Sequence, residues 1–166
     1  MINKGLMSSN KNYWETPNNF FNNLNSKYNF RWDLAASDSN HKCSNYYTEE
    51  QNSLEQDWTI LSGNLFLNPP YGRDLKCWVK KAYESSLYTD SKIVLLIPAR
   101  TDTSYWHDYI FDKADVYFIR GRLKFEINGE AKDAAPFPSA VVVYDRLNKN
   151  KNFRNKISSI LGKCIE

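Results

Sequence analysis

The apolar run at residues 93–97 constrains the fold more than any other part of this chain. Its sequence, Ile-Val-Leu-Leu-Ile, contains no polar residue. A strand with one solvent-facing side alternates apolar and polar residues, whereas a parallel strand covered by helices on both faces is apolar throughout. Residues 92–97 are therefore expected to form a central strand of an α/β fold.

The rest of the chain alternates between strand and helix patterns. Thr16-Pro17 is a good helix start, with Thr16 as the N-cap and Pro17 in the first turn. The last strand follows an Asn128-Gly129 turn signal with no room for a helix, so it is expected to be antiparallel. Strands are expected at 30–36, 64–67, 116–119 (with an extension through 123–127) and 139–144, and helices at 17–28, 48–54, 75–87 and 103–110.

The length of 166 residues suits one domain. We expect a compact domain at 13–146 between a loose segment, 1–12, and a basic tail, 147–166. No apolar run is long enough for a membrane span, and no signal peptide is evident. Three widely spaced cysteines suggest free thiols in a reducing cytoplasm, and the isolated histidines and cysteines suggest no metal site.

One motif carries a chemical expectation. Asn68-Pro69-Pro70-Tyr71 directly follows the expected strand at 64–67. Because ligands of open α/β sheets bind at the carboxyl ends of strands, this motif lies where a site is expected. The Asn68 side-chain oxygen and the Pro69 carbonyl can accept the two N–H groups of a planar amine, and Tyr71 can stack on the attached ring. Accepting both protons directs the nitrogen lone pair toward an electrophile.

The motif resembles the one found in amino-group methyltransferases that use S-adenosylmethionine. The chain from about Tyr13 to Tyr144 resembles the small phage-type DNA N6-adenine methyltransferases, the Dam-like phage family. This similarity also includes Trp14-Glu15-Thr16-Pro17, Asp33-Leu34-Ala35-Ala36-Ser37, and the segments 96–103, 121–125 and 135–139. It implies a single-domain, abbreviated class I (Rossmann-like) methyltransferase fold, mostly parallel with a late antiparallel strand, and makes 13–146 the catalytic domain.

The resemblance also implies roles for individual residues. The catalytic set is Asn68, Pro69, Pro70 and Tyr71. The residues expected to bind S-adenosylmethionine are Trp14, Thr16, Pro17, Asp33, Ala35, Ala36, Ser37 and Asp57. Asp33 is the candidate for the cofactor's ammonium group and Asp57 for its ribose or adenine. The cofactor loop departs from the glycine-rich form of many methyltransferases, because no glycine occurs between Phe30 and Leu61.

The expected partner is duplex DNA. The net charge is only +3, but the first 90 residues carry one more acid than base and the remainder carries four more bases than acids. The residues expected to contact phosphates are Arg73, Arg100, Arg120, Arg122 and Lys124. A flipped adenine is the expected acceptor. We expect a monomer without membrane association, encoded by a phage or prophage and located in the bacterial cytoplasm.

Other interpretations remain open for single residues and for the acceptor. Thr16-Pro17 is equally well explained as a plain helix start, and Asp57 is better explained as a structural residue. The Asn-Pro-Pro-Tyr sequence also occurs in methyltransferases of ribosomal RNA adenine and of protein glutamine, whose acceptors are planar amines as well. A third alternative is a DNA-binding module whose active site has decayed.

Overall fold

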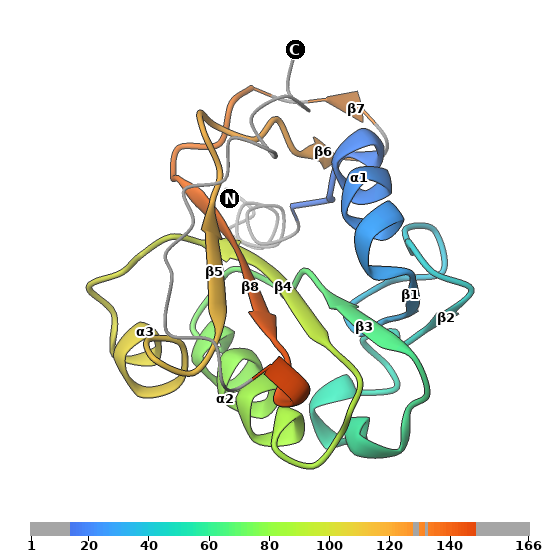
Figure 1. The fold of residues 1–166 in the computed structure, drawn as a ribbon. Coiled ribbons are helices and arrows are strands. Elements are labelled where there is room, and N and C mark those ends of the chain that lie inside the picture. Colours follow the sequence, from blue (N-terminus) through green and yellow to red (C-terminus); the bar gives the residue numbers. More distant parts are fainter. Residues whose placement is uncertain (1–13, 128–129, 132, 149–166) are drawn as a thin grey trace, which may run out of the picture.

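The computed structural model describes residues 14–127, 130–131 and 133–148 (Figure 1). They form a six-stranded sheet, in the order β2-β1-β3-β4-β8-β5, and a separate hairpin, β6-β7. The strands are β1 (Phe30–Asp33), β2 (Asn45–Tyr46), β3 (Asn64–Leu67), β4 (Ile93–Pro98), β5 (Asp115–Phe118), β6 (Glu126–Ile127), β7 (Glu130–Ala131) and β8 (Ser139–Tyr144). The expected α/β class is confirmed.

The large sheet is parallel except for one strand of the described chain. β1 pairs in parallel with β2 and β3, and β3 pairs in parallel with β4. β8 lies between β4 and β5 and is antiparallel to both. The late antiparallel strand is therefore confirmed, and it lies inside the sheet rather than at its edge. All parallel strands end at the same side, which we call the carboxyl edge, and β8 begins there because Ser139 pairs with Pro98.

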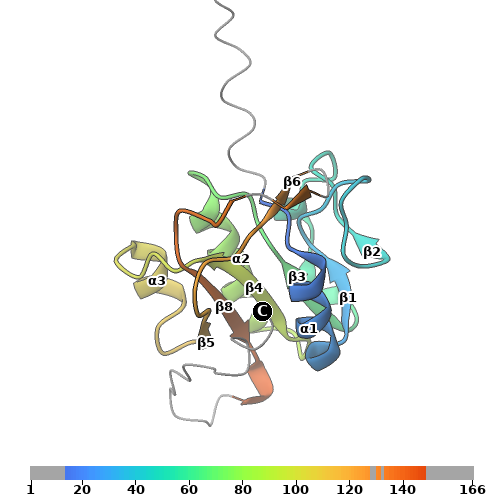
Figure 2. The ribbon, with the colours of Figure 1, turned by 90° about the horizontal axis from the view of Figure 1, so that it is seen from above.

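Helices cover both faces of this sheet. α1 (Asn18–Tyr28) lies on one face and α2 (Leu75–Ser86) on the other, with α3 (Ser104–Tyr109) packed beside α2 (Figure 2). α1 is amphipathic and buries the side chains Phe20, Phe21, Leu24 and Tyr28. Every residue of β4 and β8 is buried. This two-sided cover is the reason why residues 93–97 contain no polar side chain.

The helix expected at 48–54 is wrong. The segment contains a short 3-10 turn, η1 (Ser53–Glu55), followed by a second one, η2 (Trp58–Ile60). Gln51 Oε1 does accept the N–H of Thr48 at 2.9 Å, as in a capping box, but no α-helix follows. Trp58 is fully buried, and its indole N–H donates to the Ser53 carbonyl at 2.9 Å. The segment thus forms two short 3-10 turns, with the Trp58 side chain buried, in place of the expected helix.

The cap expected at Thr16 is also wrong. The N-cap residue of α1 is Pro17, and no side chain caps the helix. The extension of the fifth strand through 123–127 is likewise not observed, because β5 ends at Phe118 and residues 126–127 form β6. β6 lies over the carboxyl edge (Figure 1), where Glu126 and Glu15 form a reciprocal pair of backbone hydrogen bonds of 2.9 and 3.1 Å.

The chain ends fall largely outside the described residues. The expected loose segment 1–12 lies outside them entirely. Of the expected tail at 147–166, only Leu147 and Asn148 are described, as part of the 3-10 turn η3 (Arg146–Asn148). Among the helices that are described, none is both long and apolar enough to cross a bilayer.

Candidate active site

The Asn-Pro-Pro-Tyr motif lies at the carboxyl edge, in the middle of the sheet. Asn68 follows β3 directly, and β3 is flanked by β1 on one side and β4 on the other. Pro69 is buried, while Asn68 and Pro70 are half-buried. β3 ends here because proline cannot donate a backbone hydrogen bond to a neighbouring strand. The motif is thus positioned where the sequence predicted it.

The Asn68 carboxamide is held by contacts from a distant part of the chain and from its own motif. Its Nδ2 donates to the Trp14 carbonyl oxygen at 2.5 Å and to Thr16 Oγ1 at 3.0 Å. Its Oδ1 accepts from the Tyr71 hydroxyl at 2.8 Å. The structure therefore brings Trp14, Thr16, Asn68 and Tyr71 together, although the first pair precedes the second by more than fifty residues.

Tyr71 belongs to an aromatic cluster with Trp14, Phe125 and Phe137. The centroid of its ring lies 6.0 Å from that of Phe125 and 5.5 Å from that of Phe137, both in edge-to-face contacts. Trp14 packs edge to face on the same two phenylalanines, with centroid distances of 5.5 and 5.4 Å. The hydroxyl lies 3.0 Å from the Leu96 carbonyl as well as 2.8 Å from Asn68 Oδ1. Burial raises the pKa of Tyr71 well above its ordinary value, so the hydroxyl keeps its proton.

Phe125 and Phe137 were not singled out by the sequence. They belong to the segments 121–125 and 135–139, which flank the hairpin and resemble the methyltransferase family as blocks. Both rings are buried over Tyr71. The prolines on either side of Phe137 are the one local signal of a rigidly held side chain at that position. No sequence signal near Phe125 indicates that its ring contacts Tyr71.

Asp33 ends β1 at the same edge, next to β3. It is 3% exposed, and its two oxygens accept the backbone N–H of Ala35 at 3.3 Å and of Lys42 at 2.9 Å. Burial raises its pKa to about 6, against the opposing effect of these two hydrogen bonds. Asp33 thus closes the loop from 34 to 42. Ala35 and Ala36 are half-buried in this loop and Ser37 is exposed.

Asp57 and Pro17 have visible structural roles. Asp57 is exposed and caps η2, with its Oδ1 accepting from the N–H of Thr59 at 2.9 Å and from the Thr59 hydroxyl at 2.6 Å. These bonds lower its pKa. Pro17 is half-buried at the start of α1, and its carbonyl accepts the N–H of Phe21. The structural interpretation of Asp57 given above agrees with this capping geometry.

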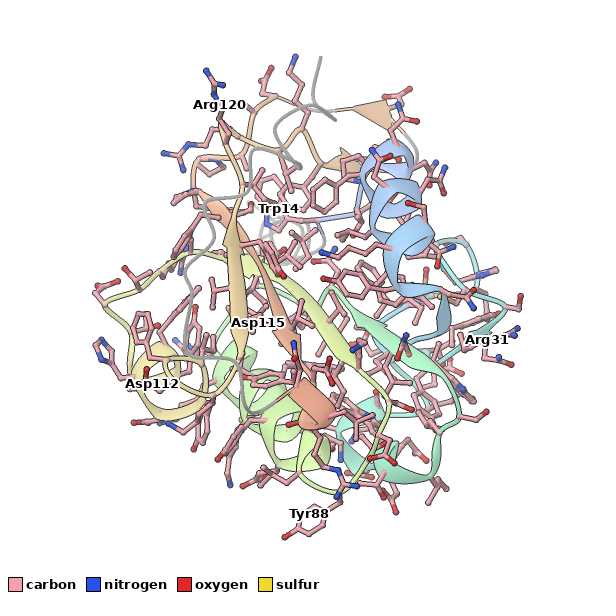
Figure 3. All side chains as sticks on the ribbon, in the orientation of Figure 1. Trp14, Arg31, Tyr88, Asp112, Asp115 and Arg120 are labelled. Atoms are coloured by element: carbon pink, nitrogen blue, oxygen red, sulfur yellow. The ribbon has the colours of Figure 1, made fainter. Side chains whose placement is uncertain are left out.

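The basic residues expected to contact DNA all follow strands that end at the carboxyl edge. Arg73 comes after β3, Arg100 after β4, and the remaining three after β5. All five side chains are exposed, and none forms an ion pair with another described residue. Arg120 extends from this edge in Figure 3, while Tyr88 and Asp112 lie toward the opposite end. The full set is Arg73, Arg100, Arg120, Arg122 and Lys124.

Among the described residues, no three His, Cys, Asp or Glu side chains form a group that could hold a metal ion. The buried carboxylate of Asp33 stands at the carboxyl edge beside three small side chains, Ala35, Ala36 and Ser37, and Asn68 follows the neighbouring strand β3.

Comparisons with known proteins agree with the fold and the motif. The family model described as "DNA N-6-adenine-methyltransferase (Dam)" matches residues 4–161. A DNA N-6-adenine-methyltransferase of Haemophilus phage HP1 is 30% identical over 151 residues, covering 87% of this chain and 85% of that protein. A protein with the same description from Escherichia phage T1 is 31% identical over 120 residues, covering 72% of this chain.

The chain spans about half of the phage T1 protein, of which 49% is covered. A putative methyltransferase of Escherichia coli, YfdM, is 43% identical over 63 residues, or 35% of this chain and 69% of that protein. The family model covers nearly the whole chain, including the Asn68 motif, the Asp33 loop and the aromatic cluster. The chain therefore belongs to the DNA N-6-adenine-methyltransferase (Dam) family.

Proposed function

We propose that this protein transfers a methyl group from S-adenosylmethionine to the N6 amine of adenine in duplex DNA. The observation that carries the proposal is Asn68, which stands at the carboxyl end of a central strand with its amide nitrogen bonded to two acceptors of the protein. Its Oδ1 is thereby left as the atom that meets an amine. The phage relatives described as DNA N-6-adenine-methyltransferases support adenine in DNA as the acceptor.

The chain's contribution to the chemistry is to hold the amine. Asn68 Oδ1 and the Pro69 carbonyl accept its two N–H groups, which directs the nitrogen lone pair away from the ring. When bound, the cofactor supplies an activated methyl group on a sulfonium. In the transfer, the methyl group would leave the sulfonium, with the electron pair of the carbon–sulfur bond remaining on sulfur, and join N6, which would release one of its protons to water. No covalent bond to the protein is needed.

The aromatic cluster must open for this reaction. Tyr71 is only 9% exposed, and Phe125 and Phe137 pack edge to face on its ring. An adenine flipped out of the duplex stacks on Tyr71 only after these rings have moved. We therefore assign the observed arrangement to the state without DNA. The segment 119–138, which carries both phenylalanines and the hairpin β6-β7, is the part that has to shift.

The exposed basic residues give the proposed DNA face. Arg73, Arg100, Arg120, Arg122 and Lys124 follow strands on the Asn68 side of the sheet. Contacts of such residues with phosphates provide affinity that falls with salt and position the duplex over the site. We place the reaction in the cytoplasm of a bacterial host, with the protein acting as a monomer and without a membrane.

A direct test compares acceptors. Purified protein is incubated with labelled S-adenosylmethionine and, separately, with duplex DNA, single-stranded RNA or a mixture of host proteins, and the products are analysed by mass spectrometry. We expect N6-methyladenine in the DNA digest only. The control is Asn45→Ala. Asn45 lies on the edge strand β2, away from the motif, and donates one side-chain hydrogen bond to the Arg31 carbonyl of β1. It should retain full activity, unlike Asn68→Ala.

Label found in RNA adenine or in glutamine instead of DNA would overturn the proposed acceptor. Absence of label from all three would favour the decayed DNA-binding module. Calorimetric titration with S-adenosylmethionine then identifies that case, because a decayed module binds no cofactor even at millimolar concentration.

A further inference from the structure

We infer that Thr16 is a positioning residue for the Asn68 carboxamide, rather than a contact of the cofactor. The inference deepens the proposed function, on which it rests, by assigning a residue that sets which atom of Asn68 meets the adenine amine. Family resemblance had placed Thr16 among the cofactor-binding residues. The hydrogen bonds of the structure give it a different partner.

Thr16 contacts Asn68 in a buried position. Its Oγ1 lies 3.0 Å from Asn68 Nδ2, and the residue is only 2% exposed. It does not serve the helix that follows, because no side chain caps α1. A hydroxyl buried in protein beside the amide is poorly placed to bind a ligand, but well placed to accept one of the two Nδ2 protons.

A carboxamide needs such contacts because its two ends are nearly the same in shape. A half-turn about the last side-chain bond exchanges Oδ1 with Nδ2. In the flipped state, Asn68 would present N–H donors to the donor groups of the adenine amine. The reaction would then lose an acceptor and gain a repulsive contact, so the orientation of this one side chain decides whether the site works.

The Trp14 carbonyl requires one orientation, and the two hydroxyls of Thr16 and Tyr71 are compatible with it. The Trp14 carbonyl can only accept, so it requires the nitrogen at its side, 2.5 Å away. Thr16 Oγ1 accepts the second Nδ2 proton. The Tyr71 hydroxyl lies 2.8 Å from the opposite end, Oδ1, and 3.0 Å from the Leu96 carbonyl, and its single proton is shared between these two acceptors. Because a carbonyl-type oxygen has two lone pairs, Oδ1 can accept from Tyr71 and from a substrate amine at the same time.

Thr16→Val tests the inference, because valine keeps the branched shape and removes the hydroxyl. Loss of one neutral hydrogen bond predicts a fall of about fivefold to tenfold in the single-turnover rate of methyl transfer. The dissociation constant of S-adenosylmethionine, measured by calorimetry, should change less than about twofold, as expected for one lost contact that the ligand does not make. Thr16→Ser keeps the hydroxyl and should restore the rate.

A matched control separates this effect from the loss of any buried threonine. Thr89 is 6% exposed, and its Oγ1 accepts the N–H of Ser91 at 3.1 Å, before the start of β4 and away from the carboxyl edge. Thr89→Val should leave the transfer rate unchanged. In an Asn68→Ala background, Thr16→Val should have no further effect on the residual rate, because the group that it positions is gone.

Nuclear magnetic resonance of protein labelled with 15N at asparagine gives a readout independent of activity. In the unmodified chain, both Nδ2 protons of Asn68 should exchange slowly with water, since both are hydrogen-bonded inside the protein. In Thr16→Val, one of them should exchange faster. This readout holds even where the protein methylates no DNA, so a failure of the proposed function is distinguishable from a failure of the inference.

Two results would overturn the assignment. The first is a Thr16→Val protein that turns over at the normal rate with saturating cofactor but binds S-adenosylmethionine several-fold more weakly, which is the behaviour of a cofactor contact. The second is a fast-exchanging Nδ2 pair in the unmodified chain, which remains decisive even if the valine variant does not fold.

Discussion

The two neighbouring strands β1 and β3 end in polar residues that are used in opposite ways. Asn68, after β3, is neutral and is held through its side chain by Trp14 and Thr16 from a distant segment and by Tyr71 of its own motif. Asp33, at the end of β1, is a buried carboxylate that holds the backbone of its own loop. We call these the amine half and the cofactor half of the proposed site. The amine half therefore depends on orientation, and the cofactor half on charge.

This difference teaches which property each half loses on substitution. A neutral side chain whose partners are mostly distant groups can be removed at small cost to the loop around it, while the reaction suffers. A buried carboxylate that accepts two backbone N–H groups cannot be removed without leaving those donors unpaired. Substitutions in the amine half should thus lower mainly the rate of methyl transfer. Substitutions in the cofactor half should lower the stability of the protein and its affinity for the cofactor.

The largest expected effect is on the rate of Asn68→Ala. Loss of one preorganised electrostatic contact at a reacting group costs about 10²-fold to 10³-fold in kcat, while the dissociation constant of S-adenosylmethionine should stay within about threefold, less than the effect of one hydrogen bond. Single-turnover kinetics and calorimetry measure the two quantities. A variant that loses cofactor affinity in parallel with rate would break the separation of the halves.

The second largest effect is expected from Asp33→Ala, which should change stability and cofactor affinity more than the rate of methyl transfer. Two partly buried N–H groups lose their acceptor, which predicts a loss of about 2 kcal/mol in the free energy of unfolding. Urea denaturation measures it, with the exposed Asp102, changed to alanine, as the control carboxylate. Affinity for S-adenosylmethionine should fall as well. Unchanged stability in Asp33→Ala would show that the loop is held by other contacts.

A smaller effect is expected in the pH dependence of stability, and its direction follows from the raised pKa of Asp33. The pKa of Asp33 is raised from 3.8 to about 6, so the folded protein binds a proton that the unfolded chain has already released in this range. The stabilising contribution of protonated Asp33 is complete below pH 3.8 and is lost as the pH rises through about 6. Asp33→Asn should flatten this part of the stability curve.

Cofactor binding should change in the opposite direction over the same range. Only the charged carboxylate attracts an ammonium group, so affinity for S-adenosylmethionine should rise as the pH increases through about 6. Calorimetric titrations with S-adenosylmethionine at pH values below and above about 6 measure this change in affinity. If affinity is flat with pH while stability is not, Asp33 supports the loop without contacting the cofactor.

The smallest effect is expected from the exposed basic residues, which lie on the amine side of the sheet. Changing both Arg120 and Arg122 to alanine should weaken DNA binding and reduce the slope of log K against log salt by about 2. Fluorescence anisotropy with a labelled duplex measures this slope. Lys113→Ala, at an exposed position before β5, is the control and should leave it unchanged. Cofactor affinity should be unaffected in both variants.

The sequence predicted five of the six strands of the large sheet, because these carry clear local signals, and it missed the two-residue strand β2. The strands at 64–67 and 139–144 have the predicted bounds, since proline stops the first and an all-apolar run marks the second. The position of Asn68 followed from the same reasoning. The helix at 48–54 was wrong because the burial of Trp58, outside that segment, favours tight turns over the local capping signal.

The contacts inside the site were not predictable from local patterns. Thr16 has the signature of a helix cap, and only the folded chain brings it to Asn68, 52 residues later. Tyr71 was predicted to present a stacking face, and nothing near it in sequence indicates that Phe125 and Phe137 cover the ring. Residue types and strand ends predict which groups reach the site. Their orientation depends on packing between distant segments.

The backbone pairing of Glu15 with Glu126 has a mechanical consequence. Trp14 and Thr16, on either side of Glu15, hold the amide of Asn68, while Glu126 follows Phe125, which covers Tyr71. A displacement that uncovers Tyr71 therefore pulls on the segment that orients Asn68. If the cluster opens as proposed, access for the base and alignment of the amide would be coupled through this pairing, and closing of the hairpin would restore both together.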